Sequence, residues 1–517
     1  MAQDHGPRAL TVEDLMSHPV VTSTPSETVA HAAARMWQHG VGSVVVIEDD
    51  RPIGILTERD LVRFTGEGAD PASGNVSEWM TADPGTVPTD VAASDAFARL
   101  AERGYRHIPV VRHGRLAGIV SLRDLVRVAR IAPVEAKAIE LPKGLEGVEV
   151  AETELGDVRG REGFYHYRQY DAIELVRKRT LEDVWFLLYD GHLPDKAERD
   201  DFAEEIRALQ AVPDHLADSL RGIARSEDGS SPLAALQAAY SLFAAGEKFR
   251  PAVDVSADEV RSQALRTCAV FPTLVAALHR LGRGDEPIEP HSRLPFVSNY
   301  LYMITGEEPS PDHARALEMY LTATIDHGFN ASTFTARVIT STGADVGSAV
   351  LGALGALSGP LHGGAPSRAL DMLHAIGSED RADSWLRNEV ESGRRLMGFG
   401  HRVYKTDDPR SMMLREVAEE LDGDMVTLAK HVERRAVEIL EELKPGRALY
   451  PNVEFYAGIV LDIIGMPREL FTPTFAVSRV IGWTAHIMEQ AAANRLIRPA
   501  AHYTGPEPPE DVPVIEG

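Results

Sequence analysis

An internal repeat restricts what the first quarter of the chain can fold into. The segment GILTERDLVR begins at Gly54, and the similar segment GIVSLRDLVR begins at Gly118, 64 positions later. Met16 and Met80 keep the same spacing, so the two copies align without a gap. A duplication of this kind predicts two copies of one small structural unit that pack as a pseudo-symmetric pair.

Each copy is expected to form a small α/β unit. Thr24-Pro25-Ser26-Glu27 has the form of a helix capping box with proline at the first helical position. The following SVVVIEDDRPIGIL is typical of two strands joined by a turn. A further helix is expected to open at Thr57-Glu58-Arg59-Asp60, and the two copies span about residues 10–66 and 74–130.

The repeated Gly-Ile-x-[Thr/Ser]-x-Arg-Asp motif resembles the motif of paired cystathionine-β-synthase-type (CBS) domains, a Bateman module. In that family the hydroxyl and the carboxylate contact the phosphate and ribose of an adenosine nucleotide. The resemblance assigns this role to Thr57 and Asp60 in the first copy and to Ser121 and Asp124 in the second. The same residues could instead cap helix starts, in a module that only builds oligomers, and the motif leaves both interpretations open.

The rest of the chain differs in composition from the repeats. IAPVEAKAIELPKG, residues 131–144, has two prolines and no repeat, which indicates a linker. Residues 145–517 are dominated by stretches with helical apolar spacing, such as SPLAALQAAYSLFAAG. The expected fold class is therefore multidomain, with a tandem α/β pair followed by a mainly α-helical domain.

Composition excludes several classes of partner and compartment. A net charge of −25 argues against a nucleic-acid partner, and the single cysteine, Cys268, excludes an internal disulfide framework and a cysteine metal cluster. The N-terminus has no apolar signal core. The uncharged run from Val346 to Ser367 contains prolines, glycines and a histidine, so it predicts a buried helix followed by a loop instead of a membrane span. We expect a cytoplasmic protein.

Four segments place polar side chains beside glycine, proline or aromatic residues. They are TIDHGFNAST with His327 and Asn330, SGPLHGGAPS with His362, MGFGHRVYKTDDPR with His401 and Arg410, and YPNVEFYAG with Glu454. Taken singly, each histidine is as well explained by a structural or surface role, and Glu454 by the helix dipole. Glycines beside two of the histidines favour a ligand site, because they allow close backbone approach.

Arginines add a second clue. Arg479 lies in the otherwise apolar stretch FAVSRVIGW, where a buried guanidinium requires an anionic partner, either an internal Asp or Glu or a substrate. Arg498 precedes a proline near the C-terminus and alone would be a surface charge. Several arginines suit a substrate with several carboxylates, and an acid with histidines suits proton abstraction beside a carbonyl. The sequence contains no HExxH, paired-cysteine or P-loop motif. The chemistry indicated is a carbon–carbon condensation through an enol.

From about Lys143 to Pro509 the chain resembles citrate synthases. GLEGV, GPLHGGA, GFGHRVYK…DPR, PNVEFY and RPAAHYTGPEP occur in the order typical of that family. The resemblance implies a homodimer or higher homo-oligomer of mainly α-helical subunits, each with a large domain and a small domain, the latter about residues 367–467. It also implies that no metal or redox cofactor takes part. Combined with the CBS resemblance, it suggests that an adenine nucleotide bound to the CBS module regulates activity.

The same resemblance implies a role for each candidate residue. His362 would donate to the thioester carbonyl of acetyl-CoA, Glu454 would remove the methyl proton, and His401 would polarise the ketone of oxaloacetate. The residues expected to bind oxaloacetate are His327, Asn330, Arg410, Arg479 and, from the partner chain, Arg498.

One residue departs from the family pattern, because the usual base there is Asp and this chain has Glu454. The extra methylene shifts the carboxylate, and such a displacement can cost about 100-fold in rate unless the site has adjusted. Two alternatives therefore stay open. The chain could be a 2-methylcitrate synthase that uses propionyl-CoA, or a nucleotide-binding regulatory protein with weak synthase activity.

Overall fold

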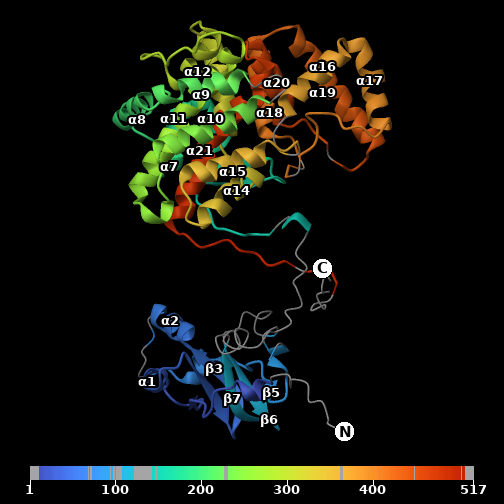
Figure 1. Ribbon diagram of the computed structural model, residues 1–517. Helices are drawn as coiled ribbons and strands as arrows, with labels where there is room; N and C mark the ends of the chain where they lie inside the picture. The colour runs from blue at the N-terminus through green and yellow to red at the C-terminus, as the bar shows by residue number, and fades with distance from the viewer. Residues whose placement is uncertain are drawn as a thin grey trace, which may run out of the picture. The chain divides into compact units, whose positions relative to one another are not determined.

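The computed structural model describes residues 11–506 except 68, 70–72, 94, 97–98, 100–106, 122–142, 146–147, 226–230, 361, 363–364, 402, 405, 448 and 502. The chain divides into two compact units, Met1–Val148 and Glu149–Gly517 (Figure 1). We call them the N-terminal unit and the C-terminal unit.

The N-terminal unit contains two small sheets with helices. Its first sheet has the order β1-β2-β3-β4, and its second has the order β5-β6-β7. The elements are η1 (Val12–Asp14), β1 (Thr22–Ser23), α1 (Val29–His39), β2 (Ser43–Glu48), β3 (Arg51–Thr57), α2 (Glu58–Gly66), α3 (Val76–Trp79), β4 (Thr81–Ala82), β5 (Val87–Pro88), β6 (His107–Arg112) and β7 (Arg115–Ser121). The expected strand pair is confirmed in both copies, since β2 pairs with β3 and β6 pairs with β7, each antiparallel.

The expected helix start at residues 24–27 is wrong. Helix α1 begins at Val29, and its N-cap is Thr28, whose side chain accepts from the backbone N–H of His31 at 3.3 Å. The Glu27 carboxylate is instead taken up by the Ser23 hydroxyl at 2.6 Å and by Arg35. Because these partners anchor the strand to the helix, residues 24–27 form a turn and the helix starts later.

The two copies of the repeat interlock. A Cβ atom at Gly54 of the first copy would lie 2.1 Å from the Met80 sulfur at the start of the second copy. Conversely, a Cβ at Gly118 of the second copy would lie 2.4 Å from the Met16 sulfur of the first. Strand β4, which lies in the second copy, also pairs with β3 of the first copy. Each copy therefore completes the packing of the other, and the absence of a side chain at the two glycines makes this close approach possible.

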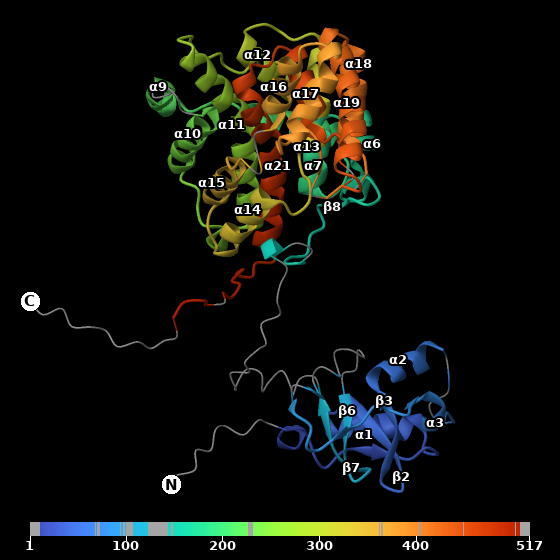
Figure 2. The same cartoon turned by 90° about the vertical axis from the view of Figure 1, so that its right-hand side faces the viewer.

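The C-terminal unit is mainly α-helical (Figures 1 and 2). Its helices are α6 (Ala172–Lys178), α7 (Leu181–Asp190), α8 (Lys196–Ala208), α9 (Ala217–Arg225), α10 (Pro232–Glu247), α11 (Ala257–Gly282), α12 (Phe296–Thr305), α13 (Pro311–Thr324), α14 (Ala331–Ser341), α15 (Val346–Leu357), α16 (Ala365–Ile376), α17 (Glu379–Glu391), α18 (Pro409–Leu421), α19 (Asp424–Leu443), α20 (Val453–Ile463) and α21 (Phe471–Ala492). A small antiparallel sheet of β8 (Gly156–Arg159), β9 (Phe164–Tyr167) and β10 (Tyr170–Asp171) precedes them. Helices α16 to α20 pack on one another and lie together on one side, in orange tones in Figure 1.

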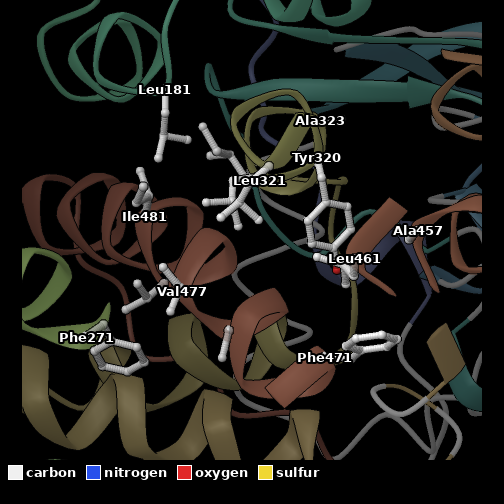
Figure 3. Close-up of a cluster of buried hydrophobic side chains, with 14 of the residues drawn as sticks. Leu181, Phe271, Tyr320, Leu321, Ala323, Ala457, Leu461, Phe471, Val477 and Ile481 are labelled. Carbon is white, nitrogen blue, oxygen red and sulfur yellow. The ribbon is translucent and has the colours of Figure 1, made fainter. Parts of the chain in front are cut away.

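Helix α21 runs through the middle of the C-terminal unit and organises its core (Figures 1 and 2). It packs against α11, α13, α14 and α15. The core around it also includes α7 and α20, and its labelled side chains are Leu181, Phe271, Tyr320, Leu321, Ala323, Ala457, Leu461, Phe471, Val477 and Ile481 (Figure 3). Burying one large apolar side chain stabilises the folded state by about 1.5–3 kcal/mol. This packing holds in place the ends of α13 and α20, where candidate site residues lie.

The uncharged run beginning at Val346 forms the buried helix α15 followed by a loop, which confirms the expectation. In the part of the chain that the structure describes, no helix is both long enough and apolar enough to span a bilayer.

Candidate active site

Two histidines, a tyrosine and an arginine converge between the end of α13 and the start of α18. His327 Nε2 lies 3.0 Å from the Tyr404 hydroxyl, and the rings of His327 and His401 are 5.4 Å apart. The Arg410 guanidinium lies over the Tyr404 ring at 5.8 Å from its centroid. Burial, with the charges of Arg410, His401 and Arg479, lowers the pKa of His327 well below its usual range. The cluster therefore offers neutral and cationic donors suited to an anionic, carbonyl-bearing ligand.

The local backbone fixes the tautomer of His401. The N–H groups of Val403 and Tyr404 both point at His401 Nδ1, each at 3.0 Å. Because backbone N–H groups only donate, Nδ1 accepts and the ring proton is on Nε2. Arg410 Nη2, which also can only donate, lies 3.5 Å from this protonated Nε2, so the two groups present donors to the same space.

Arg410 is held by Asp408, a residue that the sequence analysis did not single out. The Asp408 carboxylate accepts from Arg410 Nε at 3.0 Å and from Nη2 at 2.7 Å, and these side chains are only 1% and 3% exposed. It also accepts from the backbone N–H of Val453 at 3.2 Å. One carboxylate thus joins the start of α18 to the start of α20. The pattern Asp-Pro-Arg, typical of an N-cap before an N1 proline, could have pointed to it.

Glu454 lies in the first turn of α20, next to Val453. Its backbone N–H donates to the Asn452 side chain, the N-cap of the helix, at 3.0 Å. Burial raises the pKa of the half-buried Glu454 carboxyl to about 7. The charge of Asp408 raises this pKa further, while the charges of Arg410 and Arg368 lower it. A carboxyl with this pKa is suited to take up a proton near neutral pH.

His362 is held by Ser332, a second residue that sequence reasoning missed. The Ser332 backbone N–H donates to His362 Nε2 at 3.3 Å, and the Ser332 hydroxyl lies 2.7 Å from the same nitrogen. Nε2 therefore accepts, and the ring proton is on Nδ1. The Trp483 indole N–H of α21 donates to the same hydroxyl at 3.0 Å. Burial, then the charge of Arg479, lowers the pKa of His362 to about 4, so the ring is a neutral donor at physiological pH.

Arg479 projects from the core helix α21 and is fully buried. Its Nε donates to the backbone oxygen of Thr324, the last residue of α13, at 2.8 Å. Among the residues described, no carboxylate lies within ion-pair distance of it, which removes the internal ion pair as an explanation for its burial. Burial lowers the pKa of Arg479 to about 10, with Asp326 as the nearest compensating charge. A buried guanidinium without an ion pair is the feature expected where a substrate carboxylate binds.

Two candidate residues differ from this cluster. The Asn330 side chain caps α14 by accepting from the Thr333 backbone N–H at 3.1 Å, and Ser332 also donates to it at 2.8 Å. Arg498 is exposed, in the extended segment after α21. The structure thus brings the other candidates of the C-terminal unit together and leaves Arg498 outside the cluster of its own chain.

The candidate nucleotide residues of the first repeat form a helix cap. The Asp60 carboxylate accepts from the Thr57 hydroxyl at 2.7 Å and from the Thr57 backbone N–H at 2.9 Å, at the start of α2. Ser121 ends β7, and Asp124 lies outside the described residues. Across the described ranges, no group of three or more His, Cys, Asp or Glu side chains is arranged to hold a metal ion.

Comparison with known families settles the class of protein. The model for the citrate synthase C-terminal domain matches residues 144–500. The chain belongs to the citrate synthase family. The CBS-domain model matches residues 12–67 and 76–130, so this family member also carries a pair of CBS domains. As a citrate synthase family member, the chain is an acyltransferase.

Curated relatives of the family cover nearly the whole C-terminal unit. The citrate synthase of Haloferax volcanii is 41% identical over 379 residues, which are 73% of this chain and 99% of that protein. The 2-methylcitrate synthase of Mycobacterium tuberculosis is 38% identical over 376 residues, 73% of this chain and 93% of that protein.

Solved structures of the family share the fold. One is the citrate synthase of Thermoplasma acidophilum in a ternary complex with carboxymethyl coenzyme A and oxaloacetate. It superposes with a TM-score of 0.66 at 30% identity, covering 72% of this chain and 98% of that one. The Thermotoga maritima enzyme gives a TM-score of 0.63 at 36% identity, covering 72% and 98%. The mainly helical fold expected for the C-terminal unit is confirmed.

Proposed function

We propose that the chain condenses acetyl-CoA with oxaloacetate to give citrate and free CoA. The observation that supports the proposal is a set of groups suited to enol chemistry: Glu454, a carboxyl of raised pKa at the start of α20, and two histidines, His362 and His401, that each accept through one ring nitrogen and keep one N–H donor. Such a set suits enolisation of a thioester followed by attack on a ketone.

The reaction follows from these donors and acceptors. Glu454 takes a proton from the methyl group of acetyl-CoA, while His362 Nδ1–H stabilises the enol oxygen. The enol carbon then forms a bond to the ketone carbon of oxaloacetate, whose oxygen accepts a hydrogen bond from His401 Nε2–H. The new alkoxide takes up the proton that Glu454 removed, so Glu454 is ionised again. Water cleaves the thioester of citryl-CoA, which releases citrate and CoA. The chemistry needs no metal or redox cofactor.

The dicarboxylate is bound, in this proposal, by His327, Asn330, Arg410 and Arg479. Arg479 supplies a buried positive charge without an ion pair, and Arg410 is oriented by Asp408. Guanidinium groups match carboxylates bidentately, so two arginines suit a substrate with two carboxylates.

We infer that the protein is a homodimer and that Arg498 completes the site of the partner subunit. Helix α10 carries no charged residue before Glu247, and it exposes a stripe of Ala234, Ala238, Leu242 and Ala245. The Leu242 side chain is 44% exposed. An uncharged exposed stripe on a long helix is a typical interface between subunits.

We propose that an adenine nucleotide binds the CBS pair and regulates the enzyme. The support is the doubled motif at Thr57 and Asp60, and at Ser121 and Asp124, in a chain whose two repeats are both matched by the CBS-domain model. Asp60→Ala removes the carboxylate, so nucleotide affinity measured by calorimetry should fall in the variant. The same substitution removes a helix cap, which is worth about 1 kcal/mol. Unchanged affinity would leave capping as the role of Asp60.

A second candidate function is 2-methylcitrate synthesis from propionyl-CoA. It is favoured by the relative in Mycobacterium tuberculosis, which is named for that activity. One methylene in an apolar pocket is worth about 1–3 kcal/mol, so the two acyl-CoAs can be separated only by comparing their kcat/KM values.

The test of the proposed function is release of free thiol from acetyl-CoA by the full chain, with and without oxaloacetate. Release that depends on oxaloacetate supports the condensation. Glu454→Gln should lower it by about 100-fold to 10,000-fold, because the general base is lost. Nucleotide binding without any thiol release would favour the regulatory alternative.

A further inference from the structure

A buried arginine outside the proposed substrate ligands connects several elements of the C-terminal unit. Arg337, on α14, is only 4% exposed. Its Nε donates to the Gln490 side chain at 3.0 Å, and Nη1 donates to Glu489 and to His486 Nδ1, the latter at 3.2 Å. Its Nη2 donates to the backbone oxygen of Glu152 at 3.2 Å. All three guanidinium nitrogens of Arg337 therefore donate hydrogen bonds, which compensates for burying the charge.

The contact with Arg337 fixes the tautomer of His486. An arginine only donates, so His486 Nδ1 accepts and its ring proton is on Nε2. That nitrogen lies 3.3 Å from Asp326 Oδ1, and both groups are almost completely buried. The approach has the distance of an ion pair but not the geometry of a hydrogen bond, and neither atom has a hydrogen-bond partner among the described residues. His486 is thus the side chain that compensates the buried Asp326 carboxylate from this direction.

Asp326 is adjacent to the proposed oxaloacetate ligands. It immediately precedes His327 in the chain, and the His327 backbone N–H contributes to lowering the pKa of its carboxyl. Burial alone would raise the pKa of Asp326, but His486 and Arg479 lower it overall, so the group stays ionised. The negative charge also faces Arg479. A displacement of Asp326 would therefore move the His327 peptide and change the field at Arg479.

The other end of the network reaches the first residues of the C-terminal unit. Residues 149–155, which we call the lead-in segment, follow the linker. Glu489 Oε1 accepts from the backbone N–H of Glu154 at 2.7 Å, while Arg337 holds the backbone oxygen of Glu152. The lead-in segment has no helix or strand, and these two bonds fix its middle, while Leu155 is buried in the core and accepts from the backbone N–H of Arg168 at 2.8 Å.

We propose that Arg337 and His486 are positioning residues that couple the docking of the lead-in segment to oxaloacetate affinity. A docked segment fixes Arg337, Arg337 fixes His486, and His486 holds Asp326 and with it His327. The inference rests on the proposed function, because it takes oxaloacetate as the ligand of His327. Coupling of this kind is reciprocal, so oxaloacetate must also stabilise the docked segment.

The test combines binding and kinetics on the full-length chain. In Arg337→Met and His486→Leu, the oxaloacetate Kd from calorimetry and the oxaloacetate KM should rise about tenfold, with kcat changed much less. His486→Gln keeps a donor near the Nε2 position, so it should retain most of the parent affinity. A purely structural role would not separate Gln from Leu at this position.

A matched control is Arg266→Met. Arg266 on α11 also pairs with a glutamate, Glu247 at 2.9 Å, and holds the backbone oxygens of Leu209 and Ala211, but it contacts no candidate site residue. It should lower the melting temperature without raising the oxaloacetate KM. Equal rises in KM for Arg266→Met and Arg337→Met would overturn the proposal.

Hydrogen exchange tests the reciprocal effect. Saturating oxaloacetate should slow amide exchange in the peptide that covers residues 149–155 of the parent, and Arg337→Met should lose this protection while Arg266→Met keeps it. Unchanged exchange in a parent that binds oxaloacetate would refute the coupling. A parent that binds no oxaloacetate would refute the proposed function itself, so the two failures are distinct.

Discussion

At the scale of single residues, Glu454 makes the first prediction. Burial raises the pKa of its carboxyl to about 7, whereas His362, with a pKa of about 4, does not titrate near neutrality. The base works only when ionised, so kcat/KM should rise with pH and level off above about 7, and it should fall about tenfold per pH unit well below that value. The measurement is a pH profile of thiol release.

The control for this profile is Glu454→Asp, which shortens the side chain by one methylene. If the site is adjusted to Glu, this variant should lose on the order of 100-fold in rate, with a shifted acid limb. A parent rate that does not change between about pH 5.5 and 8 would contradict the assignment of Glu454 as the base.

Glu182 supports a prediction about stability. It is buried in α7, accepts from the backbone N–H of Phe296 at 3.2 Å, and has a pKa raised to about 7 by burial and then by Glu318. The folded state therefore keeps this proton over a pH range in which the unfolded chain has lost it. The resulting stability is complete below the unfolded pKa and is lost as pH rises through about 7.

Glu182→Gln cannot ionise, so its free energy of unfolding should fall less than that of the parent between about pH 5 and 8, by on the order of 1–3 kcal/mol. Urea unfolding at several pH values measures the difference. Glu420→Gln, at an exposed position on α18, is the control and should follow the parent. Parallel curves for Glu182→Gln and the parent would disprove the prediction.

Motif order in the sequence identified His362, His401 and Glu454 as candidates, because each lies in a segment of unusual local composition. Asp408 and Ser332 were not identified, since their importance comes from contacts with residues distant in the sequence. Asp408 joins α18 to Val453, and Ser332 joins His362 to Trp483. Neither pairing has a periodicity or spacing that a single sequence displays.

At the scale of elements, the interlocked repeats make a prediction. Gly54→Ala places a methyl group 2.1 Å from the present position of the Met80 sulfur, so Met80 must move. Overpacking of this kind costs about 1–3 kcal/mol. Met80→Ala in the same chain should recover part of the loss, and a double-mutant cycle on thermal unfolding of the N-terminal unit measures the coupling.

Gly66→Ala is the matched control, because a Cβ there meets no atom within 4 Å. It should leave stability unchanged or raise it slightly, since alanine is the better helix former. Additive effects of the Gly54 and Met80 substitutions would show that the two copies do not depend on this contact.

Elements were predicted best where one periodicity dominates. The short β-branched and apolar runs of β2 and β3 and the uncharged run of α15 predicted the correct structure. The start of α1 was misplaced because Thr24-Pro25-Ser26-Glu27 satisfies a capping pattern locally, while Ser23 and Arg35 take the Glu27 carboxylate. Glu27 does accept from the Thr24 backbone N–H at 3.4 Å, as the pattern predicts, but the helix takes Thr28 as its N-cap.

At the scale of the whole molecule, the proposed dimer predicts complementation between inactive variants. Glu454→Gln should lose its base, and Arg498→Leu should lose a substrate contact in the partner's site. In a mixed dimer, one site receives Glu454 from one subunit and Arg498 from the other, so it is intact. If the subunits assort at random, half of the dimers are mixed and the mixture should recover about a quarter of the parent activity.

Thiol release by the two variants, refolded together and refolded separately, measures this recovery. No recovery in a preparation shown to be dimeric would place Arg498 in the site of its own subunit.

The fold of the whole chain was predictable because the repeat and the helical pattern separate cleanly in the sequence. The homodimer was expected only from the family resemblance and stays a prediction, since the exposed stripe of α10 resembles other small-residue helix faces.

The interlocking of Met16 with Gly118 and of Met80 with Gly54 also has a consequence for synthesis. As the chain leaves the ribosome, the first copy emerges before Met80, which covers its Gly54. Its own Met16 then has no Gly118 to pack against. The N-terminal unit can close only after Gly118 has emerged. A nascent chain stalled between the two copies would therefore expose apolar surface, and loss of one copy by deletion would leave an unfinished fold instead of half a module.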